Sequence, residues 1–114
     1  MKGKNLRISA VVVTYNRKDD LIKTIDSILI QAANLEIIIV DNNSSDGTKD
    51  YMEQIGNSRI HYHKQNENLG SAGGFAAGMR FAAARDYDFV WLFNDDSRPV
   101  ENTFVSLRTA IDDL

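Results

Sequence analysis

The stretch VWLFNDDS at residues 90–97 joins four bulky apolar residues directly to an asparagine, two adjacent aspartates and a serine. An apolar run of this kind is typical of a strand that is covered on both faces of a sheet. In open parallel sheets, ligands bind outside the carboxyl ends of the strands. Two carboxylates directly after such a strand therefore indicate a binding site at the rim of a sheet.

Strand-like and helix-like segments alternate along the whole chain. Strands are predicted where β-branched and aromatic residues gather, at 6–16, 35–48 with its polar turn, 58–65 and 88–96. Helices are predicted at 17–31, from a cap at Ser44, Ser45 or Asp46 through Ile55, at 74–87 and at 100–114. This order predicts an α/β fold with a doubly wound, mainly parallel sheet and helices on both faces. We expect a single domain over residues 1–114.

The composition narrows the class of protein. The chain has 114 residues, of which 43% are hydrophobic and 25% charged, so a folded domain is expected rather than a disordered one. A net charge of -3 argues against nucleic acid as the main partner, and the lack of cysteine excludes disulfides. No apolar run approaches the ~20 residues that span a bilayer, and the N-terminus has no signal-peptide core. We therefore expect a cytoplasmic domain, which in a longer protein can work at the inner face of the membrane.

Polar residues end the first predicted strand. Thr14, Tyr15 and Asn16 supply a hydroxyl, a ring and an amide that can hold a base from its edge and its face. Arg17 can reach a phosphate or simply face water. Taken alone, this short motif is weak, because Tyr-Asn is common in turns.

The second predicted strand ends in Asp41, followed by Asn42. A carboxylate at this position can accept hydrogen bonds from a ribose hydroxyl or a base N–H, or it can form an Asx turn. As a residue of the rim, Asp41 is expected to lie outside the core. Replacing it should then affect nucleotide binding more than stability.

Asp95 and Asp96 are hard oxygen ligands at the end of the fourth predicted strand. Mg²⁺ and Mn²⁺ often bind through one or two carboxylates together with the phosphates of a substrate. The alternative is a solvated turn whose aspartate caps the next helix. The convergence of three polar strand ends on one rim favours the metal site.

The segment NLGSAGGFAAG at residues 68–78 follows the third strand and opens a helix. Its exposed N–H groups could approach an anion, with Asn68, Gly70 and Gly74 as contacts, although it matches neither standard glycine-rich phosphate motif. Close packing of the helix on the sheet is the preferred explanation for most of these glycines.

Four segments, SAVVVTYNR, IIIVDNNSSDGT, NENLGSAGGFAAG and WLFNDDS, occur in the order and context of family 2 glycosyltransferases of the GT-A fold. The chain resembles that family over nearly its whole length. In the family, the first two motifs hold the base and ribose of the donor nucleotide. The resemblance therefore assigns nucleotide contact to Thr14, Tyr15, Asn16 and Asp41. The glycine-rich and acidic segments look most like the branch that transfers galactofuranose or rhamnose from UDP- or dTDP-linked donors.

The acidic segment resembles the family's Asp-x-Asp motif, which holds a divalent cation against the donor diphosphate. Asn94 stands at its first position here. In relatives with such a replacement, the last aspartate is the main metal ligand. The resemblance implies that Asp96 is a ligand of Mg²⁺ or Mn²⁺ and that Asp95 contacts the ribose or supports the cation.

The resemblance further implies an enzyme of the hexosyltransferase class that transfers sugar to a glycan acceptor with inversion. In the family, the general base and the acceptor site lie well downstream of the acidic motif. We therefore expect this chain to be the truncated donor-nucleotide half, able to bind nucleotide but not to transfer sugar. The fourth strand would be paired by further elements in the complete domain, so its exposed edge predicts self-association of the chain alone.

Two other classes remain open at this point. A phosphotransfer receiver is also doubly wound with acidic strand ends, but it needs an acidic pair after the first strand, where this chain has Thr14, Tyr15 and Asn16. A non-catalytic nucleotide-binding or scaffolding module is the other alternative.

Overall fold

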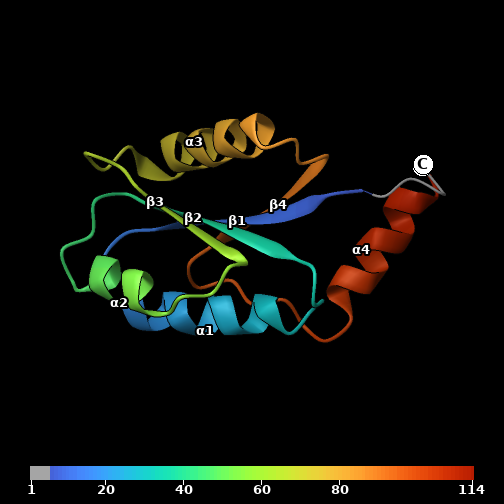
Figure 1. Ribbon diagram of the computed structural model, residues 1–114, viewed down its shortest axis with the longest axis horizontal. Helices are drawn as coiled ribbons and strands as arrows, with labels where there is room; N and C mark the ends of the chain where they lie inside the picture. Colours follow the sequence, from blue (N-terminus) through green and yellow to red (C-terminus); the bar gives the residue numbers. More distant parts are fainter. Residues whose placement is uncertain (1–5) are drawn as a thin grey trace.

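The computed structural model describes residues 6–114, so the first five residues of the predicted domain lie outside the described part. Four strands and four helices alternate as expected (Figure 1). Their bounds are β1 Ile8–Thr14, α1 Lys18–Leu29, β2 Glu36–Asp41, α2 Thr48–Gln54, β3 Ile60–Lys64, α3 Gly70–Ala84, β4 Phe89–Asn94 and α4 Thr103–Asp112. The strands form one parallel sheet in the order β3-β2-β1-β4. The predicted α/β fold is confirmed.

Helices cover both faces of the sheet, as the apolar strands require. On one face, alternate residues such as Ala10 and Val12 of β1 pack toward α1, α2 and α4. On the other face, Val11 and Val13 pack toward α3. In Figure 1, α1 and α2 lie below the sheet and α3 lies above it. β1 is buried along its whole length because it lies between two strands and between two helical layers.

Helix α3 begins at Gly70, four residues before the predicted start at residue 74. Gly70 has a φ of 71°, a left-handed conformation that glycine adopts without strain, and its N–H donates to Asn68 Oδ1 at 2.9 Å. Gly70 and Gly73, which precede the predicted start, are therefore part of the helix. A Cβ on Gly74 would lie 2.6 Å from Val13 Cγ1, so the absence of a side chain allows α3 to approach the sheet. The packing explanation for this glycine is confirmed.

Strand β4 lies at an edge of the sheet and pairs, within the described part, with β1 alone. Leu92 in its middle is 44% exposed. The predicted self-association through this edge stays a prediction. Within residues 6–114, no helix is both long enough and apolar enough to cross a membrane.

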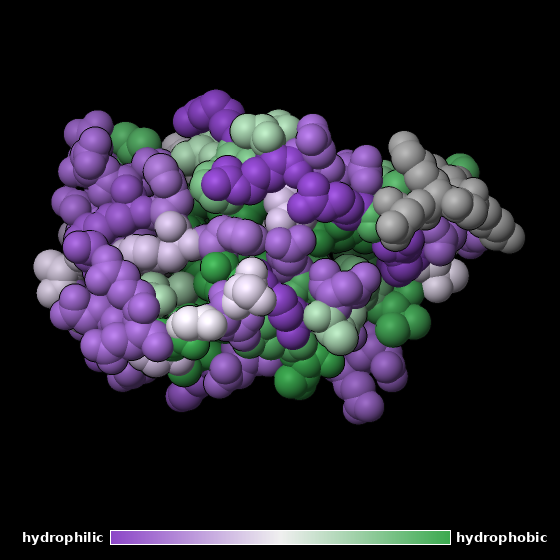
Figure 2. Space-filling view, viewed as in Figure 1, coloured by the Kyte–Doolittle hydropathy of each residue, from purple (hydrophilic) through white to green (hydrophobic). Residues whose placement is uncertain are grey.

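The carboxyl ends of the strands meet at one end of the molecule. Thr14 pairs with Asp41 and Val13 pairs with Asn94, so β1 holds the ends of β2 and β4 on either side. In Figure 2 this end, at the left, is mainly hydrophilic, with apolar residues showing between the layers further along. The fold therefore places the three polar strand ends together, as expected.

Candidate functional site

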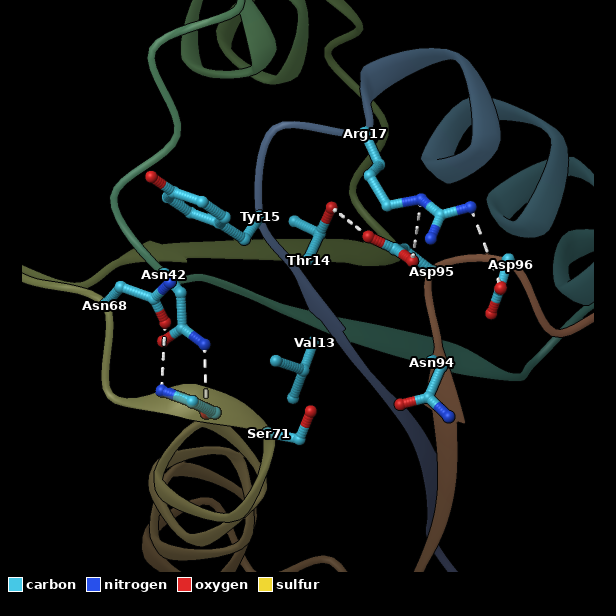
Figure 3. Close-up of a pocket in the computed structure, with 11 residues that line it drawn as sticks. Val13, Thr14, Tyr15, Arg17, Asn42, Asn68, Ser71, Asn94, Asp95 and Asp96 are labelled. Carbon is cyan, nitrogen blue, oxygen red and sulfur yellow. Dashed lines mark hydrogen bonds and ion pairs between the residues drawn. The ribbon is translucent and has the colours of Figure 1, made fainter.

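A cleft of about 370 Å³ opens at the carboxyl ends of β1 and β4 (Figure 3). It is lined by Val13, Thr14, Tyr15, Arg17, Asn42, Asn68, Gly70, Ser71, Asn94, Asp95 and Asp96. Eight of the predicted site residues are among them, whereas Asn16, Asp41 and Gly74 are not. The sequence reasoning missed Val13, Asn94 and Ser71. Ser71 could have been found by starting the predicted helix at Gly70, directly after the turn that Asn68 forms. Ser71 would then lie in the first turn of the helix, at the rim of the sheet.

Asp95 is held firmly in the wall of this cleft. It is only 7% exposed, and Thr14 Oγ1 donates a hydrogen bond to its Oδ2 at 3.0 Å. The buried hydroxyl of Thr24 in α1 donates to the backbone carbonyl of Asp95 at 2.6 Å. Burial raises the pKa of the Asp95 carboxyl, and the Thr14 hydrogen bond and the Arg17 charge only partly oppose this. The fold thus fixes Asp95 in one orientation and keeps it partly shielded from water.

Asp96 lies beside it and is half-exposed, with a side chain 51% accessible. Arg17 bridges the two aspartates, since its Nε lies 3.6 Å from Asp95 Oδ1 and its Nη2 lies 3.7 Å from Asp96 Oδ2. Figure 3 shows this guanidinium above both carboxylates. The same group donates two hydrogen bonds to Asp20 Oδ2, from Nη2 at 2.9 Å and from Nε at 3.3 Å. The hydrogen bonds that Arg17 donates to Asp20, together with the negative charges of the nearby carboxylates, raise the pKa of Arg17.

These carboxylates suit a divalent cation that takes further ligands from a substrate. The described residues contain no group of three or more His, Cys, Asp and Glu side chains that could hold a metal. Two adjacent hard oxygen donors remain, and the positive guanidinium of Arg17 already lies against them. Asp96 is the more accessible of the two. The donor set therefore fits Mg²⁺ or Mn²⁺ completed by phosphate oxygens.

The opposite wall of the cleft carries amide groups. Asn42 is buried, and its Nδ2 donates to the carbonyl of Gly70 at 3.0 Å. Its Oδ1 is buried and has no hydrogen-bond partner within residues 6–114. Buried acceptors are normally satisfied, so this oxygen indicates a place for a donor from a ligand or water. Asn42 and Asn68 together hold the left-handed turn of Gly70, and Figure 3 shows both contacts.

Asn16 links two loops and does not line the cleft, although its neighbours Tyr15 and Arg17 do. It has a φ of 51°, its Oδ1 accepts from the N–H of Ser45 at 2.7 Å, and its own N–H donates to Ser44 Oγ at 2.8 Å. The loop after β1 is therefore tied to the loop after β2. Contact of Asn16 with a nucleotide stays a prediction, as does contact of Gly74, which packs on the sheet.

Asp41 is fully buried, so the expectation that it lies outside the core is wrong. Its Oδ1 accepts from the N–H of Ser44 at 2.9 Å, and its Oδ2 accepts from the hydroxyl of Tyr62. Burial and the Asp41 carboxylate raise the pKa of Tyr62, which keeps this phenol a donor. The Asx turn and the Tyr62 side chain of β3 thus hold the carboxylate. Its contact with a nucleotide stays a prediction.

The family model "Glycosyl transferase family 2" matches residues 9–113, which is almost the whole of this α/β unit and includes every residue of the cleft. The chain belongs to glycosyltransferase family 2. The resemblance carried by the four sequence motifs is thereby confirmed, and membership of the phosphotransfer receivers is excluded.

Among relatives of this family 2 chain is the galactofuranosyltransferase GlfT1 of Mycobacterium tuberculosis, 40% identical over 91 residues that make up 78% of this chain and 30% of GlfT1. Among solved structures, S. aureus TarS 1-349 in complex with UDP aligns with a TM-score of 0.77 and 20% identity, covering 95% of this chain and 32% of that one. The mannosyltransferase PcManGT of Pyrobaculum calidifontis, solved with GDP-Man and Mn2+, aligns with a TM-score of 0.76 and 22% identity, covering 96% and 32%. The two structures share the fold. The chain spans about a third of the length of these proteins.

Proposed function

We propose that this chain is the donor-binding part of a family 2 glycosyltransferase. Its cleft binds a nucleoside-diphosphate sugar together with Mg²⁺ or Mn²⁺, and the longer protein transfers the sugar to a glycan acceptor with inversion. The observation that carries this proposal is the position of Asp95 and Asp96 at the end of β4. The same cleft holds the exposed ring of Tyr15 and Asn42, whose Oδ1 has no hydrogen-bond partner among the described residues.

Different residues of the cleft contact different parts of the ligand. Tyr15 is 45% exposed and offers a ring face on which a base can stack. Asp96, the more accessible carboxylate, holds the cation, and Thr14 orients Asp95 beside it. When bound, the cation neutralises the charge that develops on the leaving diphosphate. We assign the general base and the acceptor site to no residue of this chain.

The comparisons support the choice of donor. A relative 40% identical to this chain is a galactofuranosyltransferase, and a structure of the same fold was solved with UDP. Another structure of this fold was solved with both a nucleotide sugar and Mn2+. We therefore propose a UDP-linked donor and, within that class, UDP-galactofuranose, with dTDP-rhamnose as the competing donor.

Calorimetric titration with UDP, with and without Mn²⁺, tests this function. UDP should bind with Mn²⁺ present, and binding should weaken at least about tenfold in EDTA or in Asp96→Asn, because one ligand of a thin cation site is lost. Asp86→Asn is the matched control, since Asp86 is an exposed aspartate just beyond the far end of α3 and should leave the affinity unchanged. UDP binding that is indifferent to Mn²⁺ and to Asp96→Asn would contradict the proposal. GDP and dTDP titrated in parallel distinguish the base.

A further inference from the structure

One guanidinium faces three carboxylates at the mouth of the cleft. Arg17 lies against Asp20, Asp95 and Asp96, which come from α1 and from the end of β4. Within residues 6–114, its guanidinium donates hydrogen bonds to Asp20 alone. Its distances to the other two carboxylates, 3.6 and 3.7 Å, are those of ion pairs without a hydrogen bond. Arg17 is therefore hydrogen-bonded to Asp20 and only electrostatically attracted to Asp95 and Asp96.

The carboxylate of Asp20, which holds Arg17, is itself held by a second arginine. Asp20 Oδ1 accepts from Nη2 of Arg98 at 3.1 Å, so Asp20 is positioned between two arginines. These two hydrogen bonds lower the pKa of the Asp20 carboxyl, with the Arg17 bond contributing most. The Arg17 side chain is 49% exposed, and ion pairs at such exposure are weak and easily exchanged. The Arg17 guanidinium can therefore give up its ion pairs with Asp95 and Asp96 while its hydrogen bonds to Asp20 remain.

A cation in the proposed site would compete with Arg17. The guanidinium lies against Asp95 Oδ1 and Asp96 Oδ2, the oxygens that a divalent cation would need. Two positive groups so close together repel each other unless additional negative charge is present. A nucleoside diphosphate supplies that charge and can accept hydrogen bonds from the guanidinium.

We propose that Arg17 is a displaceable internal counter-cation that makes metal binding depend on nucleotide. In the free chain it neutralises Asp95 and Asp96 and lowers their affinity for a divalent cation. When a nucleoside diphosphate binds with its cation, Arg17 turns from these carboxylates toward the phosphates and remains fastened to Asp20. This inference rests on the proposed function and adds a coupling between its two ligands, which by linkage acts equally in both directions.

Titration of Mn²⁺ into the chain, followed by electron paramagnetic resonance of free Mn²⁺, tests the coupling. Without UDP, Arg17→Gln should bind Mn²⁺ about tenfold more tightly than the wild type, because a competing charge about 4 Å away is removed. The factor by which UDP strengthens Mn²⁺ binding should fall about tenfold in the same variant. Arg17→Lys, which keeps the charge, should bind Mn²⁺ alone as weakly as the wild type.

Lys18→Gln is the matched control for net charge. Lys18 adjoins Arg17 but forms no ion pair with Asp95 or Asp96, so its removal should change Mn²⁺ affinity less than twofold. Equal Mn²⁺ affinities of wild type and Arg17→Gln in the absence of UDP would overturn the inference, as would an unchanged UDP effect. A wild-type chain whose Mn²⁺ affinity ignores UDP would instead contradict the proposed function, and the nucleotide-free titration would still decide whether Arg17 competes.

Discussion

The buried hydroxyl of Thr24 donates a hydrogen bond of 2.6 Å to the backbone carbonyl of Asp95. Helix α1 thus fixes the acidic turn after β4 through the main chain, independently of what the carboxylate does. Thr24 is fully buried and lies 71 residues earlier in the sequence. The position of the carboxylates in the cleft therefore depends on a residue that does not line the cleft.

Thr24→Val should lower stability by about 1–3 kcal/mol, because a buried carbonyl loses its donor while the shape of the side chain is kept. It should also weaken Mn²⁺-dependent UDP binding, since the acidic turn loses its support. Thr24→Ser keeps the hydroxyl and should retain the affinity. Urea unfolding measures the stability of the two variants, and calorimetry measures their affinity for UDP with Mn²⁺. Equal UDP affinities of Thr24→Val and Thr24→Ser would show that the Thr24 hydroxyl does not support the site.

Asp41→Ala should lower the free energy of unfolding by about 3 kcal/mol, because the buried Ser44 N–H and Tyr62 hydroxyl both lose a charged acceptor. Tyr62→Phe removes only the second of these bonds and should cost about half as much. Chemical denaturation of the two variants checks the ratio. An Asp41→Ala chain of unchanged stability but lost UDP binding would restore a purely ligand-binding role.

Asp95→Asn should raise the melting temperature at neutral pH by a few degrees while weakening Mn²⁺-dependent UDP binding. Burial raises the pKa of Asp95, so the folded chain holds this proton more tightly than the unfolded chain does. The contribution of Asp95 to stability is then fully present below its unfolded pKa of about 3.9 and is lost as the pH rises through the folded value. The difference in melting temperature between wild type and Asp95→Asn should therefore shrink as the pH falls below about 4. A difference that stays constant from neutral to acid pH would show that burial of the charge is not its cause.

Gly74→Ala should destabilise the chain by about 1–3 kcal/mol, because the new methyl group would overlap Val13 Cγ1. Helix propensity alone predicts the opposite sign, since alanine is favoured over glycine by about 1 kcal/mol. Adding Val13→Ala opens space and should recover part of the loss, which a double-mutant cycle measures. A rise in melting temperature for Gly74→Ala would show that α3 does not depend on this close approach.

The fold could be predicted from the sequence because its strands are nearly continuous apolar runs and its helices have apolar residues at helical spacing. The second strand ends at Asp41 as expected, whereas the predicted first and fourth strands run two residues past the observed ends at Thr14 and Asn94. The start of α3 could not be predicted, because glycine is disfavoured inside helices, whereas Gly74 lies inside α3 and allows its packing against Val13. Local pattern carries no information about that tertiary contact.

The sequence predicted which strand ends meet at the site. It predicted less well which individual side chains line the cleft. Tyr15, Arg17, Asp95 and Asp96 line the cleft as their positions suggested. Asp41 and Asn16 do not line the cleft and accept hydrogen bonds from backbone N–H groups of the loop after β2, so their contact with a nucleotide stays a prediction. Asx residues at strand ends can bind either a ligand or their own backbone, and only the three-dimensional arrangement decides between the two.

The pairing of β4 with β1 also determines at which stage of folding the cleft can form. The hydrogen bond from Thr14 to Asp95 closes a separation of 81 residues, whereas β1, β2 and β3 pair between neighbours in the sequence. Contacts of long separation carry the larger loop-closure cost and form slowly. During synthesis the chain can assemble β1, β2 and β3 with their helices before β4 leaves the ribosome. The carboxylates then join after β1, β2 and β3, so the cleft is complete only when β4 docks on β1.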